Sequence, residues 1–189
     1  MKKLIIVALT LLLGACASVT KVDTGTRTVG ERMSMTIDAP WNHVDFPGTK
    51  PGELWTMEGI AVDEFRIYSG IKNNEVMHHE TFDRQRKSFA FRSAMQTDEI
   101  VAMFEGIVTR DQSSFTLNKL EAYPFASRKG FRFEFSRVRK SDSVQQRGIG
   151  YGVIDKGELF AMVYIAPRLT YFDKYLPRVE AIVRSVHIR

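Results

Sequence analysis

Cysteine is almost absent from this chain. Cys16 is the single cysteine among 189 residues, so no disulfide can form within the chain, and its stability must come from packing. Long apolar runs are equally scarce. The run Leu4–Leu13, broken only by Thr10, is much shorter than the roughly 20 residues that a membrane-spanning helix needs. The sequence therefore predicts no permanent transmembrane helix.

A strong charge of one sign is also missing. The chain has 27 Lys and Arg residues against 22 Asp and Glu. Two of the basic residues, Lys2 and Lys3, precede the apolar run, and without them 25 remain against the 22 acidic residues. Such a small excess permits contact with anionic lipid headgroups but gives little basis for binding DNA or RNA. We therefore expect no nucleic-acid partner.

The first sixteen residues carry a targeting signal. A basic start, an apolar run and the small residues Gly14 and Ala15 form the plan of a signal peptide. Leu13-Gly14-Ala15-Cys16 closely resembles the lipobox of bacterial lipoproteins. That resemblance implies cleavage before Cys16, a diacylglyceryl group on its thiol and further acylation. Because two or more acyl chains hold a protein stably, Cys16 is predicted to be a permanent lipid attachment site.

The residues around the anchor predict location and domain organisation. Ala17 stands where the enterobacterial pattern has an aspartate for inner-membrane retention, so the resemblance favours the outer membrane, facing the periplasm. We expect a signal peptide over residues 1–15, a lipidated flexible tether over 16–30 and a single globular domain over 31–189. The tether follows from a composition rich in Ser, Thr, Gly and Lys without an apolar period.

The strand pattern of the domain predicts a mainly antiparallel sheet. Alternation predicts a half-buried strand over 33–37, and prolines and glycines predict a surface loop over 41–52. A strand pair over 54–68 precedes a turn at Gly70. Four later strands, joined by short polar turns that favour antiparallel pairing, are expected at 115–123, 130–138, 145–154 and 158–166. The last does not alternate, which indicates a central strand covered on both faces.

Two helices are predicted to provide those covering layers. Thr97, followed by two acids, begins an amphipathic stretch to about Thr109. A second apolar stripe follows Pro167 and contains Pro177. This proline either occupies the first turn of a helix beginning near Leu176, which is favoured, or kinks a helix beginning near Tyr171. The predicted class is α+β.

The C-terminal third also resembles a known family. Gly157-Glu158-Leu159-Phe160-Ala161-Met162-Val163-Tyr164, Tyr171-Phe172 and Ile182-Val183-Arg184-Ser185-Val186 are similar to the closing hairpin and helix of PsbP-like domains. The resemblance implies a binding or assembly module and no catalytic activity.

Motifs for catalysis are absent from the sequence. There is no Gly-x-Ser-x-Gly elbow, His-Glu-x-x-His helix or phosphate-binding loop, so we predict no catalytic residue, cofactor or metal. His78-His79-Glu80 could offer metal ligands, but adjacent histidines on a strand project to opposite sides. Gly148-Ile149-Gly150-Tyr151-Gly152 is interpreted as a bent or bulged strand that another side chain approaches closely.

Two further residue sets leave alternatives open. The basic clusters either form a rim that faces the membrane or are solvated strand residues that alternate with core phenylalanines; they comprise Arg84, Arg86 and Lys87, and Arg137, Arg139 and Lys140. Trp41, Trp55, Tyr68 and Tyr123 either line a pocket for a small hydrophobic ligand or belong to a filled core.

The sequence favours a non-enzymatic binding or assembly module that is held at the membrane through its lipid and presented to an envelope protein. One alternative is a carrier or sensor of a small hydrophobic ligand. Another is a hydrolase whose carboxylates, such as Asp63, Glu64 and Glu134, are brought together by the fold.

Overall fold

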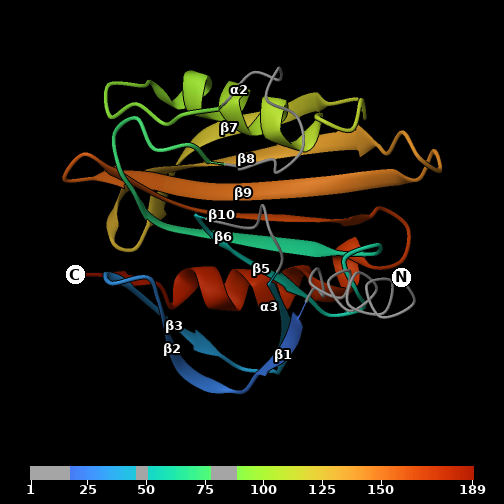
Figure 1. Cartoon of the computed structure of the whole chain (residues 1–189), viewed down its shortest axis with the longest axis horizontal. Coiled ribbons are helices and arrows are strands. Elements are labelled where there is room, and N and C mark those ends of the chain that lie inside the picture. The colour runs from blue at the N-terminus through green and yellow to red at the C-terminus, as the bar shows by residue number, and fades with distance from the viewer. Residues whose placement is uncertain (1–17, 46–50, 78–88) are drawn as a thin grey trace, which may run out of the picture.

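Two antiparallel sheets and two helices make up the described part of the chain (Figure 1). The computed structural model describes residues 18–45, 51–77 and 89–189. The elements are β1 (Ser18–Val22), β2 (Gly25–Val29), β3 (Met33–Ile37), β4 (Trp41–Asp45), β5 (Glu53–Thr56), β6 (Glu64–Ile71), α2 (Thr97–Val108), β7 (Thr116–Phe125), β8 (Arg128–Val138), β9 (Gln145–Asp155), β10 (Glu158–Pro167), α3 (Phe172–Arg184) and β11 (His187–Ile188). An eight-stranded sheet has the order β1-β4-β5-β6-β10-β9-β8-β7, and a smaller sheet has the order β11-β3-β2. The predicted α+β class is confirmed.

The central strand β10 is covered on both faces, as its sequence predicted. It pairs with β6 on one side and β9 on the other, and every residue from Leu159 to Ala166 is buried. Successive side chains point to opposite faces. Leu159, Ala161, Val163 and Ile165 enter the core under α2, whereas Phe160, Met162, Tyr164 and Ala166 enter the core under α3.

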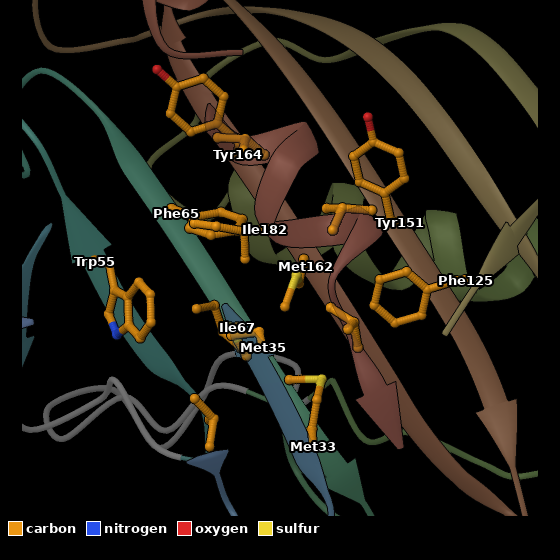
Figure 2. Close-up of a cluster of buried hydrophobic side chains, with 14 of the residues drawn as sticks. Met33, Met35, Trp55, Phe65, Ile67, Phe125, Tyr151, Met162, Tyr164 and Ile182 are labelled. Atoms are coloured by element: carbon orange, nitrogen blue, oxygen red, sulfur yellow. The ribbon is translucent and has the colours of Figure 1, made fainter. Parts of the chain in front are cut away.

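The core under α3 joins the two sheets. Figure 2 shows Met33 and Met35 of the small sheet lying beside Phe65, Ile67 and other side chains of the large sheet. All four of these side chains are at most 1% exposed. Since α3 contacts β9, β10 and β3, its buried face stabilises both sheets at once.

The flexible tether predicted over 16–30 is wrong for residues 18–29. Ser18–Val22 pairs with β4, and Gly25–Val29 pairs with β3. Two isolated valines, Val22 and Val29, are 2% and 3% exposed and fix these strands to the core. Short strands with so few apolar residues depend for their stability on pairing with other strands and on the burial of single side chains, which local composition does not reveal. The described fold therefore begins at residue 18 and not at residue 31.

Two further predictions in the first half of the domain need correction. Part of the loop predicted over 41–52 is the strand β4, which is held by the buried side chains Trp41 and Val44. Gly70, predicted as a turn, lies inside β6 with φ +73. The register against β10 shifts at this point, so Gly70 supplies the positive φ of a β-bulge.

Both predicted helices are present, and only the start of the second differs from the favoured prediction. α2 covers the predicted range, but its N-cap is Gln96, which forms a capping box with Glu99. α3 begins at Phe172, so Pro177 lies inside it and the favoured start near Leu176 is wrong. Burial of Phe172 and Tyr175, which are 1% and 5% exposed, offsets the hydrogen bond that the proline removes. Among the described residues, neither helix is long and apolar enough to span a bilayer.

Candidate binding surface

Several residues that the sequence singled out lie outside the described residues. They are Cys16, the cluster His78-His79-Glu80, and the basic residues Arg84, Arg86 and Lys87. Within the described ranges, no group of three or more His, Cys, Asp or Glu residues is placed to hold a metal ion.

The four aromatic residues proposed as pocket walls do not share a pocket. Trp41 and Trp55 pack against Phe65 in the core under α3, with ring centroids 5.4 and 6.2 Å from the Phe65 ring. Tyr68 belongs to the core under α2, on the other face of the sheet. Tyr123 lies on β7 at the far edge of the sheet. Trp41, Trp55 and Tyr68 therefore belong to filled cores.

The three carboxylates proposed for hydrolysis are held apart. Asp63 is fully buried and accepts hydrogen bonds from Thr56 Oγ1 and from backbone amides, including that of Glu58. Burial raises the pKa of Asp63 although these donors act in the opposite direction. Glu64 binds Arg66, which follows it on the same strand. Glu134 lies on β8 between phenylalanines that face α2, so its side chain points to the α3 side.

Asp63 instead stabilises the turn between β5 and β6, and this turn contacts α3. On the same turn, the Glu58 side chain accepts a hydrogen bond from the Tyr175 hydroxyl and another, 2.9 Å long, from Lys174 Nζ. These two bonds hold the pKa of Glu58 below its usual range. The cluster joins the turn to the first half of α3, which is a structural role.

The two arginines of the basic cluster in the second half of the domain are paired internally. Arg137 is 8% exposed and binds Asp111 and Gln146. Arg139 binds Asp142 and the backbone carbonyl of Ala61. These guanidinium groups are occupied by partners within the domain, so Arg137 and Arg139 do not contribute to a membrane-facing rim; Lys140 is exposed, and the other basic residues of the predicted rim lie outside the described residues.

The glycine run of β9 lies under three phenylalanine rings of β8. Phe131, Phe133 and Phe135 pair in register with Gly152, Gly150 and Gly148. Each ring occupies the space where a Cβ of its partner glycine would stand. The predicted close approach of side chains to the backbone is confirmed, whereas the register in this stretch shows no bulge.

On the α3 side, β7 and its neighbours carry a network of ion pairs, here called the ion-pair ladder: Lys119, Glu121, Arg132 and Glu134. The Glu121 carboxylate lies 2.9 Å from Lys119 Nζ and 2.8 Å from Arg132 Nη1. Arg132 also lies 2.6 Å from Glu134. Hydrogen bonds from Lys119 and Arg132 lower the pKa of Glu121, so its carboxylate stays charged at neutral pH.

On the α2 side, the same strand carries an exposed apolar row, here called the β7 stripe: Leu117, Leu120, Ala122 and Pro124. Leu117, Leu120 and Ala122 pair in register with the three phenylalanines of β8, which places them on the α2 face. Leu117 is 43% exposed and Leu120 is 36% exposed. A hollow of about 460 Å³ lies at the end of this strand, lined by Ala122, Tyr123, Pro124, Ser127, Arg128, Lys129 and Gly130.

The backbone of β7 is unpaired along one side in the described part of the chain, because β7 is the last strand of the large sheet (Figure 1). An edge strand offers free N–H and C=O groups to another strand. The β7 stripe, the ion-pair ladder and this open edge therefore form one continuous candidate binding surface. The sequence predicted a strand here but did not reveal the surface. The two exposed leucines were a possible signal, but only the strand order shows that they lie at an edge.

Comparison with known proteins shows the fold. No protein-family model and no curated protein matches this chain. A solved structure that does match is the solution structure of cyanobacterial PsbP (CyanoP) from Synechocystis sp. PCC 6803, with a TM-score of 0.57 and 14% identity. The match covers 94% of this chain and 99% of that chain. The resemblance predicted from the C-terminal third thus extends over nearly the whole molecule, and the chain has a PsbP-like α+β fold.

Proposed function

We propose that this protein is a membrane-anchored envelope module that binds or assembles with another protein and catalyses no reaction. The observation that carries the proposal is the exposed surface of β7, where an apolar stripe, charged groups and an open strand edge meet. Protein interfaces combine an apolar centre with a polar rim in this way. The resemblance to PsbP-like domains also supports a binding or assembly role.

The arrangement of the carboxylates supports the non-enzymatic part of the proposal. A carboxylate-based hydrolase needs two acids that converge on one substrate. Glu64 and Glu134 each bind a neighbouring arginine and lie on opposite faces of the sheet. Asp63 is enclosed by the turn that it stabilises. These residues are occupied in maintaining the fold.

The proposed anchor leaves the binding surface accessible. Only Ala17 separates Cys16 from β1, so lipid on Cys16 would hold the β1 edge of the sheet close to the membrane, on the periplasmic side of the outer membrane. β7 is the opposite edge of the eight-stranded sheet. The eight strands are separated by seven inter-strand spacings of about 4.8 Å each, so the two edges lie roughly 34 Å apart. The lipid would therefore not obstruct β7.

Photocrosslinking in intact cells tests this proposal. A photoreactive amino acid replaces Leu120 in one variant and Ile60, which is 41% exposed, in a matched control. We expect adducts of discrete mass from position 120 and none of the same mass from position 60. If position 120 gives no adduct, or the same adducts as position 60, the surface does not bind a protein and the proposal fails.

A second candidate function is the carriage of a small hydrophobic ligand, which the hollow beside Tyr123 and Pro124 favours. Native mass spectrometry after incubation with an envelope lipid extract tests it. A noncovalent adduct that is lost in Ala122→Glu, and retained in a control such as Lys119→Gln on the other face, would support ligand carriage. The bare protein mass alone would rule this role out for the hollow.

A further inference from the structure

We infer that the partner of β7 is β7 of a second copy of this chain, paired antiparallel about Leu120. The inference rests on the proposed function, because it names the occupant of the same binding surface. It predicts a two-fold dimer in which the two large sheets continue into one another through this edge.

The backbone geometry of β7 identifies the groups that face outward. β7 and β8 are joined by Ala126 and Ser127 with φ +51 and +59, the conformation of a two-residue type I′ turn. In such a hairpin the residues flanking the turn, Phe125 and Arg128, form the hydrogen-bonded pair. Along β7, backbone groups that face β8 alternate with backbone groups that face the open edge. Counting from Phe125, the N–H and C=O groups of Ala122 and Leu120 face the open edge.

Pro124 agrees with this alternation. It pairs with Lys129, one position further from the turn, and so it also belongs to the outward set. Proline has no N–H to donate, and on an edge strand it is tolerated where that N–H would face solvent. The register of β7 against β8 shifts between Leu117 and Lys119, so the alternation is regular from Lys119 to Pro124. The residues that face each other about an axis at Leu120, from Lys119 to Glu121, lie within this regular stretch on both copies.

The side chains of β7 are complementary to a second copy of themselves. A two-fold axis at Leu120 places Leu120 opposite Leu120 of the second copy as a hydrogen-bonded pair. Lys119 then faces Glu121 of the second copy, and Glu121 faces Lys119. Both are non-hydrogen-bonded positions, where facing side chains come closest. Lys119 is 54% and Glu121 34% exposed before pairing, so both can reach a partner.

Charge selects this register over its neighbours. An axis at Lys119 would place two lysines opposite each other, and an axis at Glu121 would place two glutamates opposite each other. Like charges at facing positions destabilise an antiparallel pair. On the other face, the axis at Leu120 brings the two β7 stripes together, so the exposed Leu120 side chains bury each other. Opposite charges and apolar burial therefore favour the same register.

The dimer is compatible with two lipid anchors. A two-fold axis places equivalent atoms of both copies at the same height along the axis. When the axis is normal to the membrane, Cys16 of each copy lies at the same depth. The β1 edges are then the outer edges of the joined sheet, and pairing through β7 leaves them free.

Disulfide trapping of the full-length, lipidated protein tests the inference. Hydrogen-bonded antiparallel pairs have Cα atoms about 5.5 Å apart, within the range that a disulfide spans. Leu120→Cys is therefore expected to form a disulfide-linked dimer under mild oxidation, whereas the exposed control Ile60→Cys is expected to remain monomeric. Thermal melting by circular dichroism checks that both variants fold. Equal crosslinking of the two variants, or none from Leu120→Cys, would overturn the inference.

A charge exchange tests the register independently. In the Leu120→Cys background, Lys119→Glu should reduce the rate of dimer formation at least several-fold, because it places glutamates at all four facing positions. Adding Glu121→Lys should restore the rate. Failure of the double exchange to restore it would refute the Leu120-centred register. Photocrosslinked adducts with the mass of a different protein, together with no trapped dimer, would overturn the inference and leave the proposed function standing; the absence of any adduct would refute both.

Discussion

Substitution of Gly150 by alanine tests whether the phenylalanine layer dictates the glycine run. The added Cβ would overlap ring atoms of Phe133, whose Cδ1 lies 3.0 Å from that position and whose Cε1 and Cζ are closer still. Favourable carbon contacts lie at about 3.5–4.0 Å. Phe133 is fully buried, and its ring packs between Phe131 and Phe135 at centroid distances of 6.3 and 5.9 Å. Phe104 of α2 packs on it at 5.8 Å, so the ring has little room to move aside.

Two effects of opposite sign decide the magnitude for Gly150→Ala. Overpacking a filled core costs about 1–3 kcal/mol. Replacing glycine by alanine restricts the unfolded chain, which stabilises by about 0.4–1 kcal/mol where the site can accept a methyl group. The overlap with Phe133 means that overpacking prevails, with a net loss of about 1–2 kcal/mol. For a protein of this size, the loss corresponds to a fall in Tm of roughly 2–8 °C.

Urea unfolding followed by tryptophan fluorescence, together with calorimetry, measures this loss. A double-mutant cycle with Phe133→Leu provides the control, because the smaller side chain makes room for the new methyl group. We expect the double variant to lose less unfolding free energy than the two single variants lose in total. The difference should be about 0.5 kcal/mol or more, as found for residues in contact. A stabilising Gly150→Ala, or strictly additive effects, would refute the reasoning.

Three further predictions concern the terminus, the helix and the anchor. Asp155 is partly desolvated, but hydrogen bonds from Arg128 and a second arginine hold its pKa below the usual range. Asp155→Asn should therefore lower the free energy of unfolding by about 1–3 kcal/mol at neutral pH. In urea unfolding, the difference from wild type should shrink as pH falls below about 4. Val179 is fully buried and Leu176 only partly, so Val179→Asp should abolish cooperative unfolding as seen by circular dichroism, while Leu176→Asp should lower Tm but still fold. Cys16→Ser should block acylation and processing, and a variant that is cleaved and still membrane-bound, judged by intact mass and fractionation, would contradict the lipid anchor.

The stability contributed by Asp155 depends on pH with a definite sign. Its folded-state pKa is lowered, so the ionised carboxylate stabilises the fold above the unfolded-state pKa, and this contribution is lost as pH falls through the folded-state pKa. Arg128 Nε lies 2.7 Å from Asp155, and Arg128 also donates to the backbone carbonyl of Ile188. Asp155 thereby stabilises the attachment of β11 at the chain end.

Local patterns were sufficient for the second half of the domain. α2, β8, β9 and β10 were predicted to within a few residues, because each has a strong apolar period or a short turn that fixes its ends. The turn over Lys156 and Gly157 has φ +53 and +80, in agreement with the hairpin that its sequence suggested. β8, β9 and β10 also pair with strands adjacent to them in sequence, so short-range information determines their boundaries.

The first half was predicted less well, because its elements depend on tertiary contacts more than on a local apolar pattern. β1 and β2 have too few apolar residues to be recognised alone, and each is held by a single valine and by pairing with β4 or β3. The start of α3 was misplaced because the effect of Pro177 on the helix was judged without the burial of Phe172. In both cases tertiary packing outweighed a local preference.

The sequence by itself determined the α+β class, the two covering helices, the central position of β10 and the prediction of lipid on Cys16. These features follow from periodicity, turn residues and a short motif, all of which are local. Only the tertiary structure decided that β7 is an edge, that its leucines are exposed and that the proposed carboxylates lie apart. Strand order is set by which segments bury each other's apolar faces across the whole chain, and a one-dimensional pattern does not contain that information.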